Sequence, residues 1–272
     1  MVKALFFDLD GTLLTSSKEI PASARDAIRQ YRSRGAHVYF ATARSPRLDQ
    51  TLGWTEAEFS LFDGGIYANG ACICLDGEEH YNYIAPDAVR ACTEAAAAYD
   101  GVHLSLHMPC EGYAFNFPVD ESMNQGWGLA QARITPIDEA AIGSTIKILL
   151  FYDRLTDSTR ALPAALGERI CREIGQKANV YIADEGRTIQ ICGKDAGKLR
   201  AIERVRMRLG LSCEEVAVFG DDVNDLEMLA FYPNSVAMGN GAAQAKEAAG
   251  FVTRANDEGG VAYALERILT KG

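Results

Sequence analysis

The sequence predicts an α/β protein in which a parallel-sheet core carries an inserted α+β domain. Three apolar segments read as buried strands, Val2–Phe7, Val38–Ala41 and Val216–Phe219, and helical patterns alternate with them. This alternation is typical of a parallel sheet with helical crossovers. Each of the three strands runs into a polar cluster, and ligands of such sheets bind at the carboxyl ends of the strands. We therefore expect a Rossmann-like core with a functional site at that edge.

The stretch between the second and third of these strands changes character near Asn82. Its patterns predict a small open sheet with helices on one side, an α+β module. We expect residues 82–187 to form this inserted domain, and residues 1–81 and 188–272 to form the core. The elements expected in the insert are the helix Pro86–Tyr99, the strands Val102–His107 and Gly112–Phe117, a helix near Glu121–Ala130, the strand Ile146–Tyr152, the helix Leu162–Ile174 and the strand Val180–Ala183.

Turn and cap residues delimit the elements of the core. Pro21 suits the first turn of a helix and Gly35 ends one, so Pro21–Arg34 is expected to be helical. Asp76-Gly77 is a strong tight-turn signal after the strand Ile73–Leu75. The other expected elements are a short helix from near Pro46, a weak strand at Phe59–Phe62, the segment Gly65–Ala71, the strand Thr188–Cys192, the helix Lys198–Leu209, a helix through Leu229, the strands Val236–Met238 and Phe251–Val252, and the helices Ala242–Ala249 and Gly260–Leu269.

Charge and composition exclude several classes of function. The 272 residues carry 27 basic and 37 acidic side chains, a net charge of −10, whereas nucleic acids and anionic membranes favour basic partners. No segment approaches the ~20 apolar residues of a membrane span, and no signal peptide is recognisable. Of the seven cysteines only Cys72 and Cys74 are closely spaced, which favours reduced thiols over a zinc site. We expect a cytoplasmic protein, a monomer or a small homo-oligomer.

The first candidate site directly follows the strand Val2–Phe7. Asp8 and Asp10 are spaced so that both carboxylates can point into one cavity, and burying two acids is costly unless a cation or a substrate uses them. Phosphoryl transfer needs such a pair, because one carboxylate attacks phosphorus while the other protonates the leaving oxygen. A hard cation such as Mg²⁺ would neutralise the crowded oxygens. An Asx-turn closed by Gly11 would explain the same residues without chemistry.

Further polar groups are predicted to meet this pair at the same edge of the sheet. Thr42 can bond phosphate oxygens, although it could also cap a helix. Lys198 can neutralise a nucleophile and a phosphoryl group, although most lysines at helix starts lie in solvent. Asp221, Asp222 and Asp225 follow a very apolar strand. Three acids within five residues exceed what a helix cap needs, and this favours a metal site.

The segments Asp8–Thr12, Thr42, Lys198 and Gly220–Asp225 resemble the four ordered motifs of the haloacid dehalogenase superfamily, in its phosphatase branch. The resemblance covers nearly the whole chain. The insert falls between the second and third motifs, which is similar to the type IIB cap of Cof-like sugar phosphatases. Two further segments also resemble that subfamily, Asn69–Ala71 and Val236–Gly241.

The resemblance implies a role for each matching residue. Asp8 would be the nucleophile, Asp10 the general acid/base, and Lys198 the residue that orients the phosphoryl group. Phosphate or substrate binding would fall to Thr42, Ala43, Arg44 and Asn224, and metal ligation to Asp8, Asp10, Asp221 and Asp225.

Three positions depart from the subfamily pattern. Ala43 and Leu199 stand where glycine is common, and Asp222 replaces a glycine. Lys194 is consequently a rival for the lysine role, and Lys198 is preferred because its spacing to the end of the following helix matches the subfamily.

Together these features predict a Mg²⁺-dependent phosphatase that acts on a small phosphorylated metabolite through an aspartyl-phosphate on Asp8. Sugar phosphates are the expected substrates by analogy, and phosphorylated cofactors are also compatible. Two alternatives stay open, a phosphomutase of the phosphomannomutase type and a non-catalytic protein that binds phosphometabolites. The insert is expected to select the substrate. Its candidate residues, each of which core packing or a surface position would also explain, are His107, Glu111, Tyr113, Phe115, Asn116 and Trp127.

Overall fold

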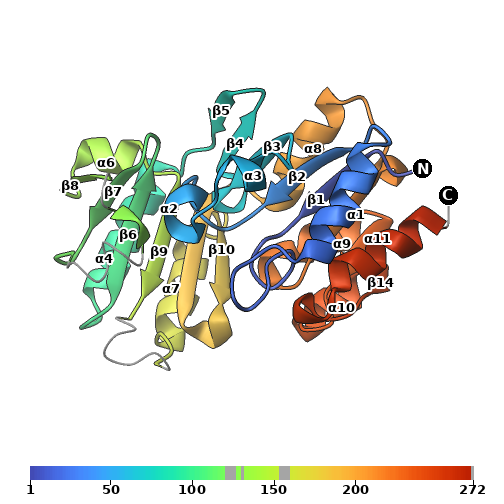
Figure 1. Cartoon of the computed structure of the whole chain (residues 1–272). Helices are drawn as coiled ribbons and strands as arrows, with labels where there is room; N and C mark the ends of the chain where they lie inside the picture. Colours follow the sequence, from blue (N-terminus) through green and yellow to red (C-terminus); the bar gives the residue numbers. More distant parts are fainter. Residues whose placement is uncertain (120–126, 130–131, 153–159, 271–272) are drawn as a thin grey trace. The chain divides into compact units, whose positions relative to one another are not determined.

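A computed structural model describes residues 1–119, 127–129, 132–152 and 160–270 of the chain (Figure 1). The chain divides into two compact units. The core unit comprises Met1–Arg44, Leu52–Glu79 and Lys198–Gly272, and the insert unit comprises Ser45–Thr51 and His80–Gly197. Most of the helix expected near Glu121–Ala130 lies outside the described residues.

The core sheet has the predicted parallel arrangement. In the described part of the chain its eight strands lie in the order β14-β13-β12-β1-β2-β3-β4-β5. Strands β14 to β3 run parallel, and β4 pairs antiparallel with β3. The strands are β1 (Ala4–Phe7), β2 (His37–Ala41), β3 (Gly64–Tyr67), β4 (Cys72–Leu75), β5 (Glu78–Tyr81), β12 (Val216–Gly220), β13 (Asn234–Ala237) and β14 (Phe251–Val252).

The helices of the core bury the apolar stripes that the sequence predicts. Ala24, Ile28 and Tyr31 are the buried residues of α1 (Ala22–Arg32), and the hydroxyl of Tyr31 donates to the carbonyl of Leu265 in α11 at 3.1 Å. The helices with core-unit residues are α1, α3 (Glu56–Phe59), α8 (Lys198–Arg208), α9 (Leu226–Phe231), α10 (Ala243–Ala248) and α11 (Gly260–Thr270).

One expected strand of the core is wrong. The segment predicted as a strand at Phe59–Phe62 contains the end of the helix α3. A capping box starts this helix, because the Thr55 hydroxyl accepts from the Ala57 amide while the Glu58 carboxylate accepts from the Thr55 amide at 2.9 Å. Two satisfied N-terminal donors favour the helix over the strand that the apolar residues suggested.

The insert unit contains its own sheet, with six described strands in the order β10-β11-β9-β6-β7-β8. The segment Thr188–Cys192, which we expected in the core, belongs to β11 and pairs with β9 and β10. The strands are β6 (His103–Met108), β7 (Gly112–Phe115), β8 (Arg133–Thr135), β9 (Lys147–Phe151), β10 (Ala178–Ala183) and β11 (Thr188–Gly193), and the helices are α2 (Leu48–Leu52), α4 (Pro86–Ala97), α6 (Glu139–Gly143) and α7 (Ala164–Ile174).

The two faces of the insert sheet differ in chemistry. Alternate residues of β6 and β9 such as Leu104, Leu106 and Ile148 join the buried cluster formed with α4, α6 and α7. Side chains of the intervening residues point to the other face because the side-chain period of a strand is two. That face carries polar groups that are nevertheless buried, among them His107 and Lys147, which lie opposite each other.

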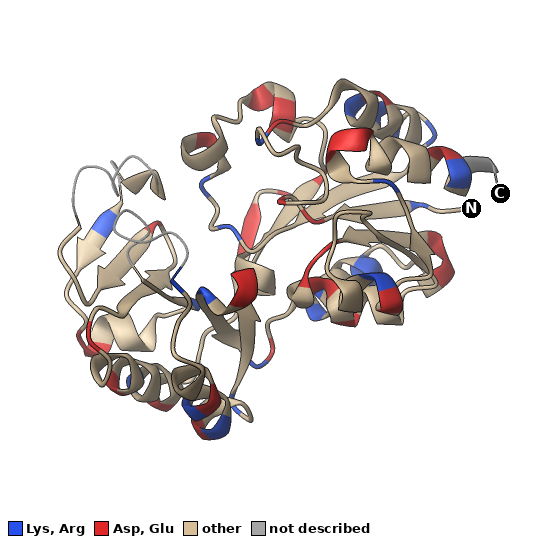
Figure 2. Ribbon diagram, turned by 90° about the horizontal axis from the view of Figure 1, so that it is seen from below, with Lys and Arg blue, Asp and Glu red and all other residues tan. Residues whose placement is uncertain are grey.

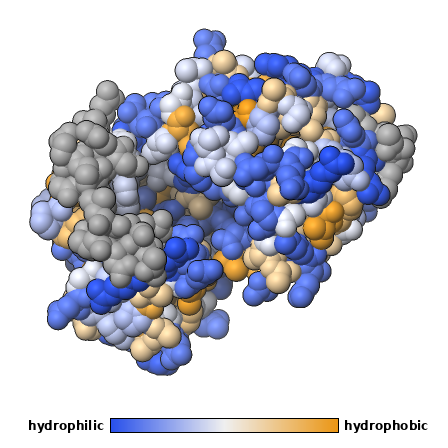
Figure 3. Space-filling model, turned by 60° about the horizontal axis from the view of Figure 1, so that its bottom comes forward, coloured by the Kyte–Doolittle hydropathy of each residue, from blue (hydrophilic) through white to orange (hydrophobic). Residues whose placement is uncertain are grey.

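Basic and acidic residues both occur along the helices and loops of each unit (Figure 2). The face drawn in Figure 3 is mainly hydrophilic where its residues are described, with hydrophobic residues scattered among them. Within the described residues, no helix is both long and apolar enough to cross a lipid bilayer.

Candidate active site

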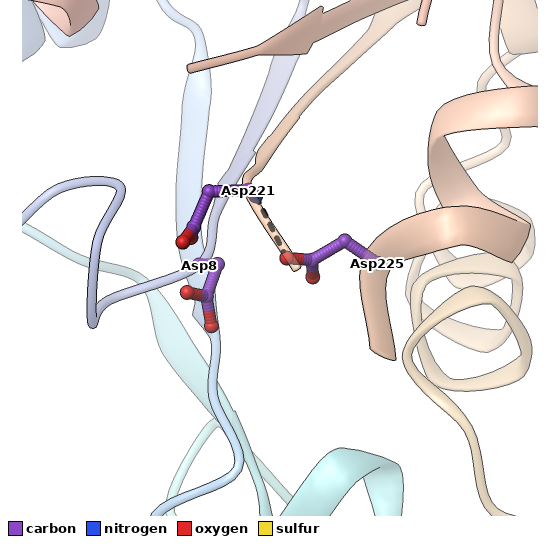
Figure 4. Close-up of side chains that lie close together, drawn as sticks. All are labelled: Asp8, Asp221 and Asp225. Carbon is purple, nitrogen blue, oxygen red and sulfur yellow. Dashed lines mark hydrogen bonds between the residues drawn. The ribbon is translucent and has the colours of Figure 1, made fainter. Parts of the chain in front are cut away.

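Three carboxylates of the core unit meet where β1 and β12 end. Asp8 follows β1, Asp221 follows β12, and Asp225 closes the 3₁₀ helix Val223–Asp225. One oxygen of each carboxylate lies within 4.8 Å of those of the other two (Figure 4). The two strands are parallel neighbours, and the amide of Asp8 donates to the carbonyl of Phe219 at 2.9 Å. This register brings together two acids that are distant in the sequence.

Lys198 is the cation of this cluster. Its ammonium donates to Oδ1 of Asp8 and to Oδ1 of Asp225, at 2.6 Å in each case, and its side chain is 1% exposed. Lys194, its rival for the lysine role, instead donates to the carbonyl of Gly175 at 3.1 Å in the insert unit. The first residue of α8 therefore supplies the lysine that contacts Asp8.

Asp225 supports the site through both of its oxygens. Besides Oδ1, which accepts from Lys198, its Oδ2 accepts from the backbone amides of Asp221 at 2.9 Å and Asp222 at 3.2 Å. Figure 4 shows the Asp225 carboxylate turned toward the backbone of Asp221. These bonds hold the lysine and the loop after β12, and Asp225 also belongs to the three-carboxylate cluster for which the sequence predicts it as a metal ligand.

Asp221 is held by the turn that contains the first motif. Its Oδ1 accepts from the hydroxyl of Thr12 at 2.6 Å. Gly11 has φ +80°, and a Cβ on this residue would lie 2.2 Å from Oδ2 of Asp221. Only glycine fits both the left-handed backbone and this close approach, so the glycine of the first motif is needed for the position of Asp221.

The electrostatics of the three acids indicate a deficit of positive charge. Burial raises the pKa of Asp8 well above its usual value, and Asp225 and Asp221 add to the rise, although Lys198 opposes it. Burial and the charge of Asp225 raise the pKa of Asp221 to about 7. Burial favours the neutral form of Lys198, but Asp225 and Asp8 outweigh it and raise the pKa of the lysine. Crowded carboxylates with raised pKa values are typical of sites that receive a cation or a reacting group.

The donor set fits a hard divalent cation. Oxygen ligands from Asp and backbone carbonyls are those that such ions prefer. Asp8 and Asp221 use Oδ1 in the hydrogen bonds described above, which leaves Oδ2 of each carboxylate for a cation.

Asp10, the second acid of the first motif, has a different environment. Burial favours its neutral form, but hydrogen bonds and charge from Arg44 and then from Lys18 outweigh burial and lower its pKa to about 2. Arg44 donates from Nε to Oδ2 at 2.6 Å and from Nη2 to Oδ1 at 2.8 Å, and Lys18 donates to Oδ1 at 2.7 Å. Arg44, which the sequence predicts as a substrate-binding residue, thus forms an ion pair with Asp10 in this structure.

The second and fourth motifs are joined by Asn69. The backbone amide of Asn69 donates to the carbonyl of Thr42 at 3.0 Å, and its side-chain oxygen accepts from the amide nitrogen of Asn224 at 2.9 Å. Asn69 is 1% exposed and has φ 54°, a left-handed conformation that asparagine tolerates better than most residues. Thr42 is also buried, and its hydroxyl accepts from the Arg44 amide at 3.1 Å across Ala43. The sequence predicted Thr42 and Asn224 as phosphate ligands but gave Asn69 no role.

A second polar cluster lies wholly in the insert unit. Nδ1 of His107 lies 2.9 Å from the Ser45 hydroxyl, and Nη1 of Arg47 donates to Oε2 of Glu111 at 2.6 Å. The ring of Tyr113 lies 4.8 Å from that of His107 between centroids. Two of the expected insert candidates, His107 and Glu111, therefore contact the segment Ser45–Thr51, and a third, Tyr113, packs on His107. The sequence did not single out Ser45 or Arg47.

The other insert candidates have packing roles in the structure. The side chain of Asn116 hydrogen-bonds to the backbone: its oxygen accepts from the Leu104 amide at 2.7 Å, and its nitrogen donates to the Val102 carbonyl at 3.0 Å. Phe115 and Trp127 pack edge to face with 6.0 Å between ring centroids. Both rings belong to the aromatic group that includes His107, on the polar face of the insert sheet.

Comparison with known proteins gives consistent matches along the chain. A family model described as haloacid dehalogenase-like hydrolase matches residues 5–265. The chain is similar to "Putative phosphatase YkrA" of Bacillus subtilis, with 26% identity over 277 residues, 98% of this chain and 97% of that protein. It is also similar to 5-amino-6-(5-phospho-D-ribitylamino)uracil phosphatase YitU of the same organism, with 26% identity over 268 residues, 97% of this chain and 96% of that protein.

Solved structures share the fold over both units. A haloacid dehalogenase-like hydrolase from Bacteroides thetaiotaomicron matches with a TM-score of 0.77 and 25% identity, covering 98% of this chain and 100% of that chain. The subclass IIB sugar phosphatase BT4131 matches with a TM-score of 0.81 and 23% identity, covering 98% of this chain and 99% of that chain. These matches confirm the predicted fold class, a parallel-sheet core with an inserted α+β domain.

Proposed function

This chain belongs to the haloacid dehalogenase-like hydrolase family, as its four motifs suggested, and we propose that it is a Mg²⁺-dependent phosphatase of small phosphorylated metabolites. Membership confirms the predicted enzyme class, a hydrolase, and the likeness to a subclass IIB structure agrees with the predicted type of insert. The curated relatives described above are named as phosphatases. The finer proposal concerns the residues and the intermediate.

The observation that carries the proposal is the placement of Lys198 between Asp8 and Asp225, 2.6 Å from each, beside Asp221. A carboxylate that attacks a phosphate ester meets strong repulsion between like charges, and a fixed ammonium next to the nucleophile reduces it. Asp8 would attack phosphorus and form an aspartyl-phosphate, and the ester oxygen would leave with a proton from Asp10. Water would then attack this intermediate, giving its proton to Asp10 and releasing phosphate and the Asp8 carboxylate.

Asp10 can serve as the acid only after it gains a proton, and its ion pairs with Arg44 and Lys18 keep it ionised. A bound phosphate is a competing partner for the Arg44 guanidinium, because arginine binds phosphate and carboxylate with the same pair of donors. Substrate binding would in this way free Asp10 to take up a proton.

Asp8 and Asp221 would hold the cation, together with the backbone carbonyl of Asp10, and Asp225 would support them through Lys198 and the loop. When bound, a divalent cation neutralises the oxygens of the nucleophile and of the phosphoryl group. The raised pKa values of Asp8 and Asp221 support this assignment, since both reflect carboxylates that lack a compensating charge.

The proposal is tested by phosphate release from a panel of sugar phosphates and phosphorylated cofactors. The wild type is assayed with Mg²⁺, with EDTA, and with EDTA followed by excess Mg²⁺, beside Asp8→Asn. Asp26→Asn is the matched control, because Asp26 has the same chemistry but a side chain that is 76% exposed on α1.

We expect metal-dependent release of phosphate by the wild type and by Asp26→Asn, and none by Asp8→Asn. With a substrate labelled in its phosphate, acid quench of the wild-type reaction should leave label bound to Asp8. A folded wild type that releases no phosphate from any compound would overturn the phosphatase proposal. Isomerised sugar phosphate without free phosphate would identify a phosphomutase instead, and metabolite binding without either product would identify a binding protein.

A further inference from the structure

The insert unit contains a buried arginine whose main hydrogen-bonding edge has no protein partner. Among the described side chains, the buried nitrogen and oxygen atoms without a hydrogen-bond partner are Nε and Nη2 of Arg47. The side chain is 1% exposed, and only Nη1 is engaged, by Glu111. Burying an unpaired donor costs about 1–3 kcal/mol, and native proteins contain few such groups. Arg47 therefore calls for an explanation beyond packing.

The two unpaired atoms form the edge that arginine uses for oxyanions. Nε–H and one Nη2–H point in the same direction, so that the pair donates two parallel hydrogen bonds to a carboxylate or a phosphate. The core unit shows the same edge in use, because Arg44 binds Asp10 through its Nε and Nη2 at 2.6 and 2.8 Å. Arg47 presents the corresponding edge without a carboxylate.

The surroundings hold Arg47 in place at a cost to the backbone. Glu111, which binds Nη1, lies in the turn between β6 and β7, where Cys110 and Glu111 both have positive φ, 53° and 58°. Such residues are uncommon outside glycine, asparagine and aspartate, and strain of this kind concentrates at functional sites. The neighbouring link from Ser45 to His107, 2.9 Å, fixes the start of the same segment to β6.

We propose that Arg47 is the anion-binding side chain of a substrate subsite in the insert, so that the substrate carries a second oxyanion besides the phosphate that is hydrolysed. The ligand class is a phosphate monoester that also bears a carboxylate or a second phosphate. The proposal rests on the proposed function in one respect, since it takes the ligand to be the substrate.

The test uses pairs of ligands that differ in the second anion. Glucose 6-phosphate is compared with 6-phosphogluconate for the carboxylate, and fructose 6-phosphate with fructose 1,6-bisphosphate for the second phosphate. Dissociation constants are measured by calorimetry in the Asp8→Asn background, where turnover does not interfere, with and without Arg47→Met, Arg47→Lys and the control Arg172→Met. Arg172 lies exposed on α7 of the same unit.

We expect the Asp8→Asn protein to prefer one ligand with a second anionic group over its partner without that group. Arg47→Met should reduce this preference by about 100-fold or more, as the loss of two charge-assisted hydrogen bonds implies. Arg47→Lys keeps the charge but not the paired donors and should recover little of the preference. Arg172→Met should keep it in full. The pair that shows the preference identifies the second anion as carboxylate or phosphate.

Two results would overturn the inference: no preference for either ligand with a second anionic group, or a preference that survives Arg47→Met. Thermal unfolding separates binding from folding, because a variant whose unfolding midpoint lies well above the assay temperature is folded when its binding is measured. Phosphate release by the wild type is assayed in parallel. Arg47-dependent binding without release would refute the phosphatase but keep the subsite, and release without Arg47 dependence would do the reverse.

Discussion

Arg44 and Asp10 form a two-point ion pair, with Nε 2.6 Å from Oδ2 and Nη2 2.8 Å from Oδ1. Arg44 therefore contacts the proposed acid, in a geometry that one guanidinium can satisfy and one ammonium cannot. The pair fixes the orientation of the Asp10 carboxylate at the edge of the sheet.

The first prediction concerns Arg44, which pairs with Asp10 in the structure and which the substrate phosphate would engage in the proposed reaction. Arg44→Met should lower kcat/KM by about 100-fold or more, since two charge-assisted hydrogen bonds to the substrate phosphate contribute about 1.5–3 kcal/mol each and 1.36 kcal/mol corresponds to a factor of ten. Arg44→Lys should recover only part of the loss. Steady-state kinetics of both variants on the best substrate of the panel provides the measurement. Wild-type kinetics in Arg44→Lys would contradict a role for the paired donors.

The second prediction concerns Asp225, which is fully buried and bonded at both oxygens. In Asp225→Asn the amide nitrogen must face either Lys198 or the backbone amides, which are all donors, and the lysine loses half of its counter-charge. Removing one partner of a buried ion pair typically costs about 3–5 kcal/mol. Urea denaturation should show a loss of this size, with Asp26→Asn as the exposed control. A stability equal to that of the wild type would show that Asp225 does not hold the loop.

The cluster of acids at the edge of the core sheet could be predicted from the sequence, because short-range patterns indicate the strands that the acids follow. Asp8 and Asp221 each follow a strand as apolar as any in the chain, and parallel strands place their carboxyl ends together. The contact of Arg44 with Asp10 and the burial of Arg47 depend on tertiary packing, for which a single arginine in a loop gives no signal. The misassigned strand at Phe59–Phe62 had a local signal, since Thr55 and Glu58 form an S/T-x-x-E box.

The boundary of the insert shows a similar limit. β11 has the alternating pattern of any strand, and pattern alone did not reveal that it pairs with β9 and β10. The hairpin before it was visible in the sequence, but a hairpin leaves open which sheet receives its second strand.

The third prediction concerns Asp221 and the cation. The pKa of Asp221 is raised to about 7 in the fold, whereas an unfolded aspartate titrates near 3.9. Between these values the folded state binds more protons than the unfolded state, so stability should fall as pH rises from about 4 to about 7 when no metal is present. Asp221→Asn should therefore unfold at a higher temperature than the wild type in EDTA at pH 8.

Added Mg²⁺ should reverse this order. A ligand at 100 times its dissociation constant stabilises the folded state by about 2.7 kcal/mol, and this gain should appear in the wild type but not in Asp221→Asn. Scanning calorimetry at pH 5 and pH 8, with EDTA or Mg²⁺, gives four unfolding temperatures for each protein. An equal Mg²⁺ shift in both proteins would place the cation elsewhere.

The fourth prediction concerns His107 in the insert unit. Burial, and then the charge of Lys147, holds the pKa of His107 well below its usual value, and its two ring nitrogens lie 2.9 and 3.0 Å from the hydroxyls of Ser45 and Ser105. The unfolded histidine gains a proton below about pH 6.5, but the folded one does not. The unfolded state then binds more protons, so stability should decrease as pH falls below that value, by up to about 1.4 kcal/mol per pH unit.

Trp127 provides a local probe of this effect, because its ring lies 6.1 Å from that of His107 and the chain has only two tryptophans. In a Trp54→Phe background its fluorescence reports urea denaturation of the insert unit at pH 5, 6, 7 and 8. His107→Gln keeps a hydrogen-bonding side chain but cannot titrate, so its stability should vary less with pH. His37→Gln, a change at a half-exposed histidine of the core unit, should leave the pH dependence of the Trp127 signal unaltered. A wild-type profile in His107→Gln would assign the pH dependence to another group.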